Sequence, residues 1–195
     1  MFSDQPRNLP LFPLSTILFP GGRLPLKIFE QRYLGLIKHC LAEDATFGLC
    51  GIRHGHEVGE PATPYEVGTE ARIVEWDMPQ TGIFHIMVEG LARYVARDWS
   101  AQADGLLVAA VQSVTPERAC PIPEELRLCE EVLKHIHADQ SVQLASTHFD
   151  DAVWVGYRLA EILPFKLSVR QDLLEMNDPL TRLRIIDQFL RRQIK

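Results

Sequence analysis

The prolines near the N-terminus are the strongest constraint on what this chain can fold into. The stretch LPLFPLSTILFPGGRLPLKIFEQRY, from Leu9 to Tyr33, places four prolines among large apolar residues, and Pro6 lies just upstream. Each proline ring removes a backbone donor and clashes with the carbonyl one turn earlier, so no helix can run through residues 6–25. We predict two extended arms joined by a turn at FPGG, and because prolines are confined to sheet edges, we expect both arms at an edge.

A hairpin is the clearest element further along the chain. The segments EARIVEWDM (70–78) and GIFHIMVEGLARYVARDW (82–99) alternate between apolar and polar residues, and MPQTG between them supplies turn residues. The alternation places Phe84, Ile86 and Val88 on one face of the second strand. A buried face on this side of the hairpin is therefore predicted.

One helix interrupts the strand-rich part of the chain. In EQRYLGLIKHCLAED (30–44) the apolar residues recur at helical spacing, with Glu30 in the first turn. Further strands are predicted for ATFGLCGIR (45–53) and GLLVAAVQSV (105–114). About six strands with edge prolines and one helix favour a small, strongly bent β-barrel with the helix plugging one side.

The period of the apolar residues changes to 3.6 after about Glu117, which predicts a helical second part. The segments EELRLCEEVLKHIH and FDDAVWVGYRLAEILPF each have helical spacing. Ser168 with Gln171 has the pattern of a capping box, and Asp178 before Pro179 is typical of a helix start. The last helix has an apolar stripe made of Leu180, Leu183, Ile186, Leu190 and Ile194.

Charge and composition restrict the partners and the compartment. The formal net charge is −6 and the 20 basic residues are scattered, whereas nucleic-acid binders carry a basic stripe. The N-terminus MFSDQPRN does not resemble a secretory signal, and the longest apolar run, LLVAAV, is too short to span a membrane. We therefore expect a cytoplasmic protein with no nucleic-acid or membrane partner. Its thiols are expected to be free and buried: Cys40, Cys50, Cys120 and Cys129.

Four segments occur in an order that resembles the N-terminal domain of the Lon ATP-dependent protease and the free-standing proteins built from it. They are the opening stretch, YEVGTEARIVEW, IMVEGLARY, and RLAEILPFKLSVRQDLLEMNDPLTRLRIIDQFL, so the resemblance runs from about Leu9 to Phe189. It implies an α+β fold, with a PUA-like β-barrel over residues 1–117 followed by a helical bundle over residues 118–195. The family's role implies recognition of proteins for a protease.

The chain ends at Lys195, where the full protease would continue into ATPase and peptidase domains. We therefore expect a recognition module that is not an enzyme. Neither a phosphate loop of the form GxxxxGK[ST] nor a GxSxG elbow occurs, and no cofactor is predicted.

Two His-x-His pairs raise the question of a metal site. His135 and His137 lie on a predicted helix, where positions two apart point about 200° apart around the axis and cannot share one ion. His54 and His56 lie in a loop, but no further ligands are fixed by spacing, so a solvated loop is the favoured interpretation. No metal site is predicted.

A tryptophan in the helical part is one candidate for binding a partner. Trp154 shares the polar stripe of its helix with Asp151, Arg158 and Glu161. It is either exposed for binding or packed against the barrel, and the second alternative is favoured.

The start of the helix over residues 30–44 is the other candidate. Tyr and Arg are frequent anchors at recognition surfaces, which favours Glu30, Arg32 and Tyr33, although Tyr33 could equally fill the barrel mouth. A binding groove is proposed beside the opening arms and this helix. Three residues of the opening arms flank it: Phe12, Phe19 and Arg23.

The leading hypothesis is a module that binds unfolded protein, or a specific protein or peptide partner, with a separate protease as a further partner. An extended peptide could add to a strand edge in the opening stretch. Two alternatives remain open: a PUA-like RNA-binding protein, which the acidic balance disfavours, and a small-molecule enzyme working in the barrel mouth.

Overall fold

The computed structural model describes residues 5–139 and 147–193 and has a mixed α+β fold. It divides into two compact units, residues 1–116 and 117–195. The first unit contains β1 (Arg7–Leu14), β2 (Arg23–Ile28), α1 (Gln31–Glu43), β3 (Phe47–His54), β4 (Thr63–Gln80), β5 (Ile83–Ala101) and β6 (Leu107–Ser113). The second contains a short 3-10 helix (Glu124–Leu126), α2 (Arg127–Ala138), α3 (Ala152–Ile162), α4 (Leu167–Glu175) and α5 (Pro179–Gln193).

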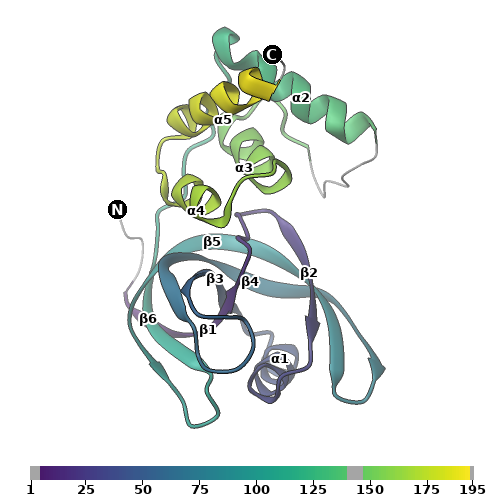
Figure 1. Ribbon diagram of the computed structural model, residues 1–195, viewed down its shortest axis with the longest axis vertical. Coiled ribbons are helices and arrows are strands. Elements are labelled where there is room, and N and C mark those ends of the chain that lie inside the picture. Colours follow the sequence, from purple (N-terminus) through teal and green to yellow (C-terminus); the bar gives the residue numbers. More distant parts are fainter. Residues whose placement is uncertain (1–4, 140–146, 194–195) are drawn as a thin grey trace. The chain divides into compact units, whose positions relative to one another are not determined.

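The six strands form one sheet in the order β2-β5-β4-β3-β1-β6, and β6 pairs in addition with β5 (Figure 1). The strands β5, β4, β3, β1 and β6 are therefore connected in a ring of neighbours, with β2 attached outside it to β5. The pair β1–β3 is parallel and the other pairs are antiparallel. The predicted hairpin is confirmed: β4 and β5 pair up to Gln80 and Ile83 across a two-residue turn.

The first proline-rich arm is not at an edge, which corrects the prediction for β1. This strand pairs with β6 over residues 7–11 and with β3 over residues 11–14. Pro10 thus lies before the pairing with β3 begins, and Pro13 lies after the pairing with β6 has ended. Each proline has a neighbouring strand on one side only, so the sheet accommodates its missing donor without placing the strand at an edge.

The second arm behaves as predicted. β2, which contains Pro25, pairs with β5 alone among the strands of the described residues. The two arms do not pair with each other, because β1 lies between β3 and β6.

The FPGG turn is held against the middle of β5. The Gly21 N–H donates to the Gly90 carbonyl at 2.8 Å, and the Gly90 N–H donates to the Gly22 carbonyl at 2.9 Å. A Cβ atom on Gly90 would lie 2.3 Å from the backbone oxygen of Phe19. Glycine is therefore required at this point of the EGLARY segment.

A pair of glycine substitutions tests this close approach. Gly90→Ala is expected to lower the free energy of unfolding by about 1–3 kcal/mol, the usual cost of forcing extra volume into a packed site. Gly35→Ala is the control: it lies on the exposed side of α1 with nothing within 4 Å of an added Cβ, so it is expected to add about 0.5–1 kcal/mol. Urea unfolding of both variants measures the two effects. Equal stability of Gly90→Ala and wild type would show that the turn can move away from β5.

Two apolar clusters fill the first unit. One brings the buried side of α1 against the strands and includes Phe84, Ile86 and Val88, the face that the alternation predicted. The other lies among β1, β3, β5 and β6 around Tyr94, whose hydroxyl donates to the Leu49 carbonyl at 3.3 Å. The strand faces thus follow the period of two read from the sequence.

In the second unit the two predicted caps have different outcomes. Asp178 precedes α5 and accepts a hydrogen bond from the Thr181 N–H at 2.9 Å, which confirms the predicted helix start. The predicted capping box is wrong, because α4 begins at Leu167 and Ser168 is already inside the helix. The Gln171 amide instead donates to Glu175, at 2.7 Å.

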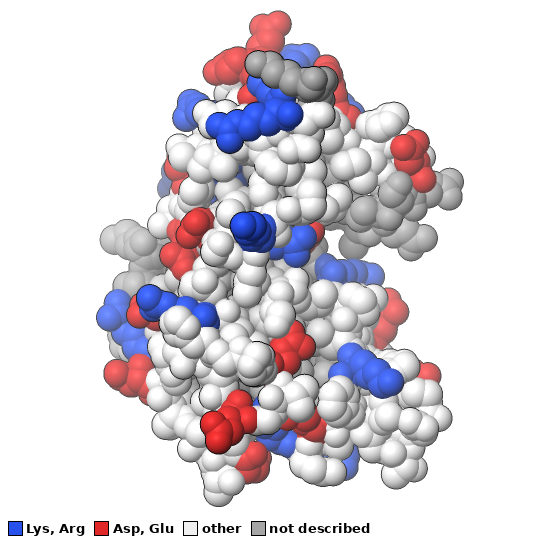
Figure 2. All heavy atoms as spheres, viewed as in Figure 1, with Lys and Arg blue, Asp and Glu red and all other residues white. Residues whose placement is uncertain are grey.

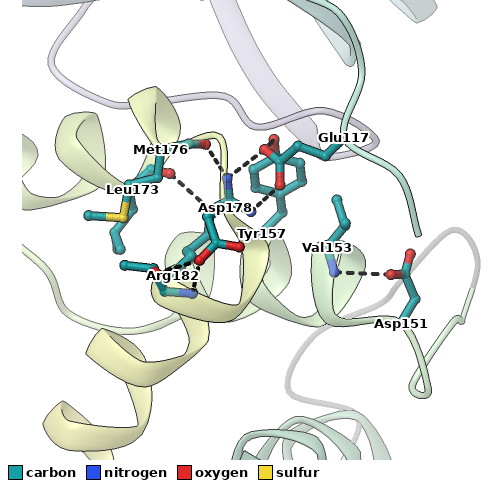
Figure 3. A network of polar contacts seen from close by, with 9 residues as sticks. Glu117, Asp151, Val153, Tyr157, Leu173, Met176, Asp178 and Arg182 are labelled. Carbon is teal, nitrogen blue, oxygen red and sulfur yellow. Dashed lines mark hydrogen bonds and ion pairs between the residues drawn. The ribbon is translucent and has the colours of Figure 1, made fainter. Parts of the chain in front are cut away.

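A fully buried arginine connects α5 with α3 and α4 in the second unit (Figure 3). Arg182 of α5 forms two hydrogen bonds to the carboxylate of Glu117, at 2.6 and 2.9 Å. It also donates to the backbone carbonyls of Leu173 and Met176, at 2.9 and 2.6 Å. Its guanidinium lies 4.2 Å from the ring centre of Tyr157 in α3.

The predicted stripe of α5 is buried at Leu183, Ile186 and Leu190, while Leu180 is half-buried and Ile194 lies outside the described residues.

Candidate functional site

The structure places the two phenylalanines of the opening stretch inside the first unit. Phe19 is 0% exposed and offers no surface to a partner. Phe12 is also buried, and its ring stacks on Tyr33 with 3.8 Å between ring centres. Both side chains belong to the packing that the prolines and the FPGG turn hold together.

The residues at the start of α1 form a compact polar cluster. Glu30 lies at the N-cap instead of in the first turn, and its carboxylate pairs with the buried guanidinium of Arg32 at 2.9 Å. Arg32 also donates to the Glu57 carbonyl at 3.2 Å. Burial, the largest cause, raises the pKa of Tyr33 to about 12, so its hydroxyl remains protonated at neutral pH. Tyr33 lines one hollow, and Glu30 and Arg32 line another, which has a volume of about 240 Å³.

The remaining two candidates lie in different units. Arg23, on β2, is exposed and lies 3.7 Å from the carboxylate of Glu75. Trp154, on α3, is half-buried and makes edge contacts with His148 and Phe149 of its own unit, at 6.0 and 5.4 Å between ring centres. Of the seven predicted residues, the structure brings Phe12 together with Tyr33 and Glu30 together with Arg32, while Trp154 belongs to the other unit.

Among residues 5–116 of the first unit, four large apolar side chains are exposed, and none was among the predicted residues. They are Phe29 at 51%, Val58 at 59%, Trp76 at 56% and Met78 at 47% exposure. The sequence contained a signal for the exposure of two of them. Trp76 lies two residues before the predicted MPQTG turn and Met78 begins it, and side chains near the tip of a hairpin extend past the core of the sheet. Phe29 follows directly after the edge strand β2.

Two hollows adjoin β2 and share Pro25, Leu26 and Lys27 in their walls. The larger has a volume of about 490 Å³, and its other lining residues come from β4 and β5, including Trp76 and Met87. The smaller has a volume of about 150 Å³ and is lined mainly by apolar residues: Phe12, Leu14, Ile28, Phe29, Tyr33 and Val58. We call these two hollows, with the four exposed apolar side chains, the β2 surface.

The charges around the β2 surface are mixed. Lys27, Glu75, Asp77 and His85 line the larger hollow. Figure 2 shows basic and acidic residues interspersed on the face in view, with no continuous basic stripe. A surface of mixed charge suits a polypeptide that is uncharged, or in which charged and uncharged side chains alternate, better than it suits a nucleic acid.

The described residues also define what chemistry is available. No group of three or more His, Cys, Asp or Glu side chains able to hold a metal ion occurs among residues 5–139 and 147–193. All four cysteines are free, and burial raises the pKa of Cys40 to about 11 and of Cys50 and Cys129 to about 12. Thiols with such values are poor nucleophiles at neutral pH. Within the part of the chain that the structure describes, no helix is long and apolar enough to cross a membrane.

Comparison with known proteins links the chain to proteases and to one other class of protein. Lon protease 2 of Myxococcus xanthus is 28% identical over 203 residues, which cover 97% of this chain and 24% of that protein. Protein cereblon of Danio rerio is 33% identical over 124 residues, which cover 62% of this chain and 28% of that protein. The chain thus spans about a quarter of the length of these relatives.

Solved structures and a family model cover nearly the whole chain. A Lon N-terminal domain protein from Xanthomonas campestris has a TM-score of 0.78 and 33% identity, over 92% of this chain and 96% of that one. The N-terminal domain of Lon protease from the Mycobacterium avium complex has a TM-score of 0.62 at 16% identity over the same shares, which shows the fold alone. The family model of the ATP-dependent protease La (LON) substrate-binding domain matches residues 8–192. The chain therefore belongs to the family of LON substrate-binding domains, as the order of its four segments predicted.

Proposed function

We propose that this protein is a non-enzymatic recognition module that binds unfolded or extended segments of other proteins at the β2 surface. The observation that carries the proposal is that three exposed apolar side chains line the two hollows, Trp76 the larger and Phe29 and Val58 the smaller, with the exposed Met78 two residues beyond Trp76. Exposed apolar groups that gather beside a hollow are typical of protein interaction sites, whereas scattered ones are not. Membership of a substrate-binding family supports the same conclusion.

The finer features of the fold and the cell location are part of this proposal. The ring of strand neighbours supports a PUA-like β-barrel over residues 1–117, and the contacts of α3 with α2, α4 and α5 support a helical bundle over residues 118–195. Four free thiols fit a reducing compartment such as the cytoplasm. The relatives named Lon protease make a protease the class of protein that would receive what the module binds.

The proposal is tested by titrating a labelled, reduced and carboxymethylated protein against the wild type and following fluorescence anisotropy. We expect dissociation constants from roughly micromolar to millimolar, about −8 to −4 kcal/mol, because ordering the bound segment offsets much of the contact energy. Salt should change the affinity less than it changes nucleic-acid binding, where many phosphate contacts release counterions.

A double variant and a matched control locate the site. Trp76→Ser with Met78→Ser is expected to weaken binding at least about tenfold, as loss of central aromatic contacts does at other interfaces. Arg53→Ser with Gln102→Ser also removes two exposed side chains, but neither lines the two hollows of the β2 surface, so binding should be unchanged. Absence of binding by the wild type at millimolar concentration would refute the function. Equal binding by the folded Trp76 and Met78 variant would refute the site.

A further inference from the structure

The free edge of β2 carries a defined set of backbone groups. β2 pairs with β5 along one edge, and no described residue pairs with the other. The hydrogen bond from the Gly90 N–H to the Gly22 carbonyl, just before the strand, shows that the carbonyl of residue 22 is directed toward β5. The direction of the backbone N–H and C=O groups alternates from residue to residue along an antiparallel strand. The backbone groups of Leu24, Leu26 and Ile28 therefore also face β5.

The other three residues of β2 face the free edge. Arg23, Pro25 and Lys27 therefore present three carbonyl acceptors there and two N–H donors, since proline has none. The position of Pro25 agrees with this phase, because proline in a strand is tolerated where its missing donor would face away from the neighbour. Successive groups at this edge are about 6.4–6.8 Å apart, the two-residue repeat of an extended chain.

The side chains of β2 divide in the same way. Leu24 and Leu26 are half-buried and Ile28 is buried in the core cluster, whereas the side chains of Arg23, Pro25 and Lys27 are exposed. The smaller hollow is lined by Leu26 and Ile28 from this apolar side and also by Pro25 and Lys27, so it lies along the strand and its apolar walls are within reach of an added chain. A strand added to the edge would direct every second side chain toward the apolar side and the others toward Lys27 and toward Arg23, which lies 3.7 Å from Glu75.

From this edge we propose that β2 captures polypeptide by strand addition, and that the segment it takes alternates apolar with acidic side chains. The apolar residues pack toward the smaller hollow, and the acidic residues face Arg23 and Lys27. Pro25 fixes the register, because the incoming strand meets no donor at the centre of β2. Proline and lysine also restrict open-ended pairing between copies of the edge. This inference rests on the proposed function and specifies how its site binds.

Hydrogen exchange tests the main-chain contacts directly. The probe is a synthetic nine-residue peptide that alternates valine and glutamate, added to saturation to the full chain. The amide protons of Arg23 and Lys27 are expected to exchange at least about tenfold more slowly, while those of Leu24 and Leu26, already bonded to β5, should change little. Unchanged exchange at Arg23 and Lys27 with the peptide bound would overturn the inference.

Backbone methylation separates strand addition from simple pocket binding. Methyl groups on the nitrogens of every second peptide residue should abolish binding in one frame and leave it within about threefold in the other. Similar affinities in both frames would overturn strand addition and leave the proposed function intact. Strand addition is likewise overturned, and the proposed function left intact, if the peptide fails to bind at millimolar concentration while the carboxymethylated protein binds. If neither ligand binds, both the proposed function and this inference fail.

A charge reversal tests the acidic preference. Lys27→Glu is expected to weaken binding of the valine–glutamate peptide at least about fivefold and to strengthen binding of a valine–lysine peptide. Lys38→Glu makes the same charge change on the exposed side of α1 and should have neither effect. If the Lys27→Glu variant binds each of the two peptides as tightly as the wild type does, the proposed acidic preference is contradicted.

Discussion

An Arg182→Met variant is expected to lower the free energy of unfolding of the second unit by about 3–5 kcal/mol, the usual cost of removing one partner of a buried ion pair. The side chain of Arg182 is 0% exposed, and that of its partner Glu117 is 4% exposed. Methionine fills much of the arginine's volume but donates no hydrogen bond. The variant would therefore leave a carboxylate in a site from which water is excluded.

The loss is expected to be large because Arg182 joins segments that are distant in sequence. Glu117 begins the second unit, and the hydroxyl of Tyr157 in α3 lies 2.6 Å from the same carboxylate. The carbonyls of Leu173 and Met176, which also accept from Arg182, are at the end of α4 and just beyond it. One side chain thus satisfies polar groups from three places, and each would be left without this donor.

Urea unfolding followed by circular dichroism measures the effect. Arg184→Met is the matched control, because Arg184 lies on the exposed side of the same helix and should change stability by no more than about 0.5 kcal/mol. Adding Glu117→Leu to Arg182→Met should recover part of the loss, since replacing both partners of a buried pair by apolar groups is often nearly neutral. A stability of Arg182→Met equal to that of Arg184→Met would show that the ion pair contributes nothing.

Local patterns were sufficient to predict the elements that depend on local physics. The alternation around Phe84, Ile86 and Val88 located the β4–β5 hairpin and its buried face. The dipeptide Asp178–Pro179 located the start of α5, because both residues act within one turn of the helix. The order of the four segments identified the family.

Strand order could not be predicted from the same patterns. The prolines of β1 indicated an edge, but the strand lies between β3 and β6, because its two neighbours cover different halves of it. Ser168 and Gln171 matched a capping box, but the helix begins one residue before Ser168. For β1 the outcome depends on pairing with segments far apart in sequence.

The binding candidates show the same limit. Phe19 and Arg32 have residue types typical of recognition surfaces, but both side chains are buried, and Arg32 contacts Glu30 and the Glu57 carbonyl. Trp76 was not selected, because its exposure depends on how far the β4–β5 hairpin extends beyond the neighbouring strands. Side-chain type alone does not separate an anchor for a partner from an anchor for the core.

Leu183→Ala is expected to lower the free energy of unfolding of the second unit by about 2–5 kcal/mol, as a cavity left in a packed core does. Leu183 is fully buried on α5, and the thiol of Cys129 in α2 lies 3.7 Å from its carbonyl oxygen. It faces α3 at Gly156, where an added Cβ would lie 3.7 Å from a Leu183 methyl group.

The upper half of this range is expected because the cavity has little means of collapse. Gly156 has no side chain that could move into the space, and Arg182, next to Leu183, is fixed by its hydrogen bonds to Glu117 and two carbonyls. Leu180→Ala is the control: it removes the same atoms from a half-buried position of the same helix and should cost about 1 kcal/mol or less. Unfolding midpoints in urea would decide between these expectations. Equal losses for the two variants would mean that α5 shifts toward α3 when Leu183 is truncated, so that the packing at Gly156 does not hold the helices at a fixed distance.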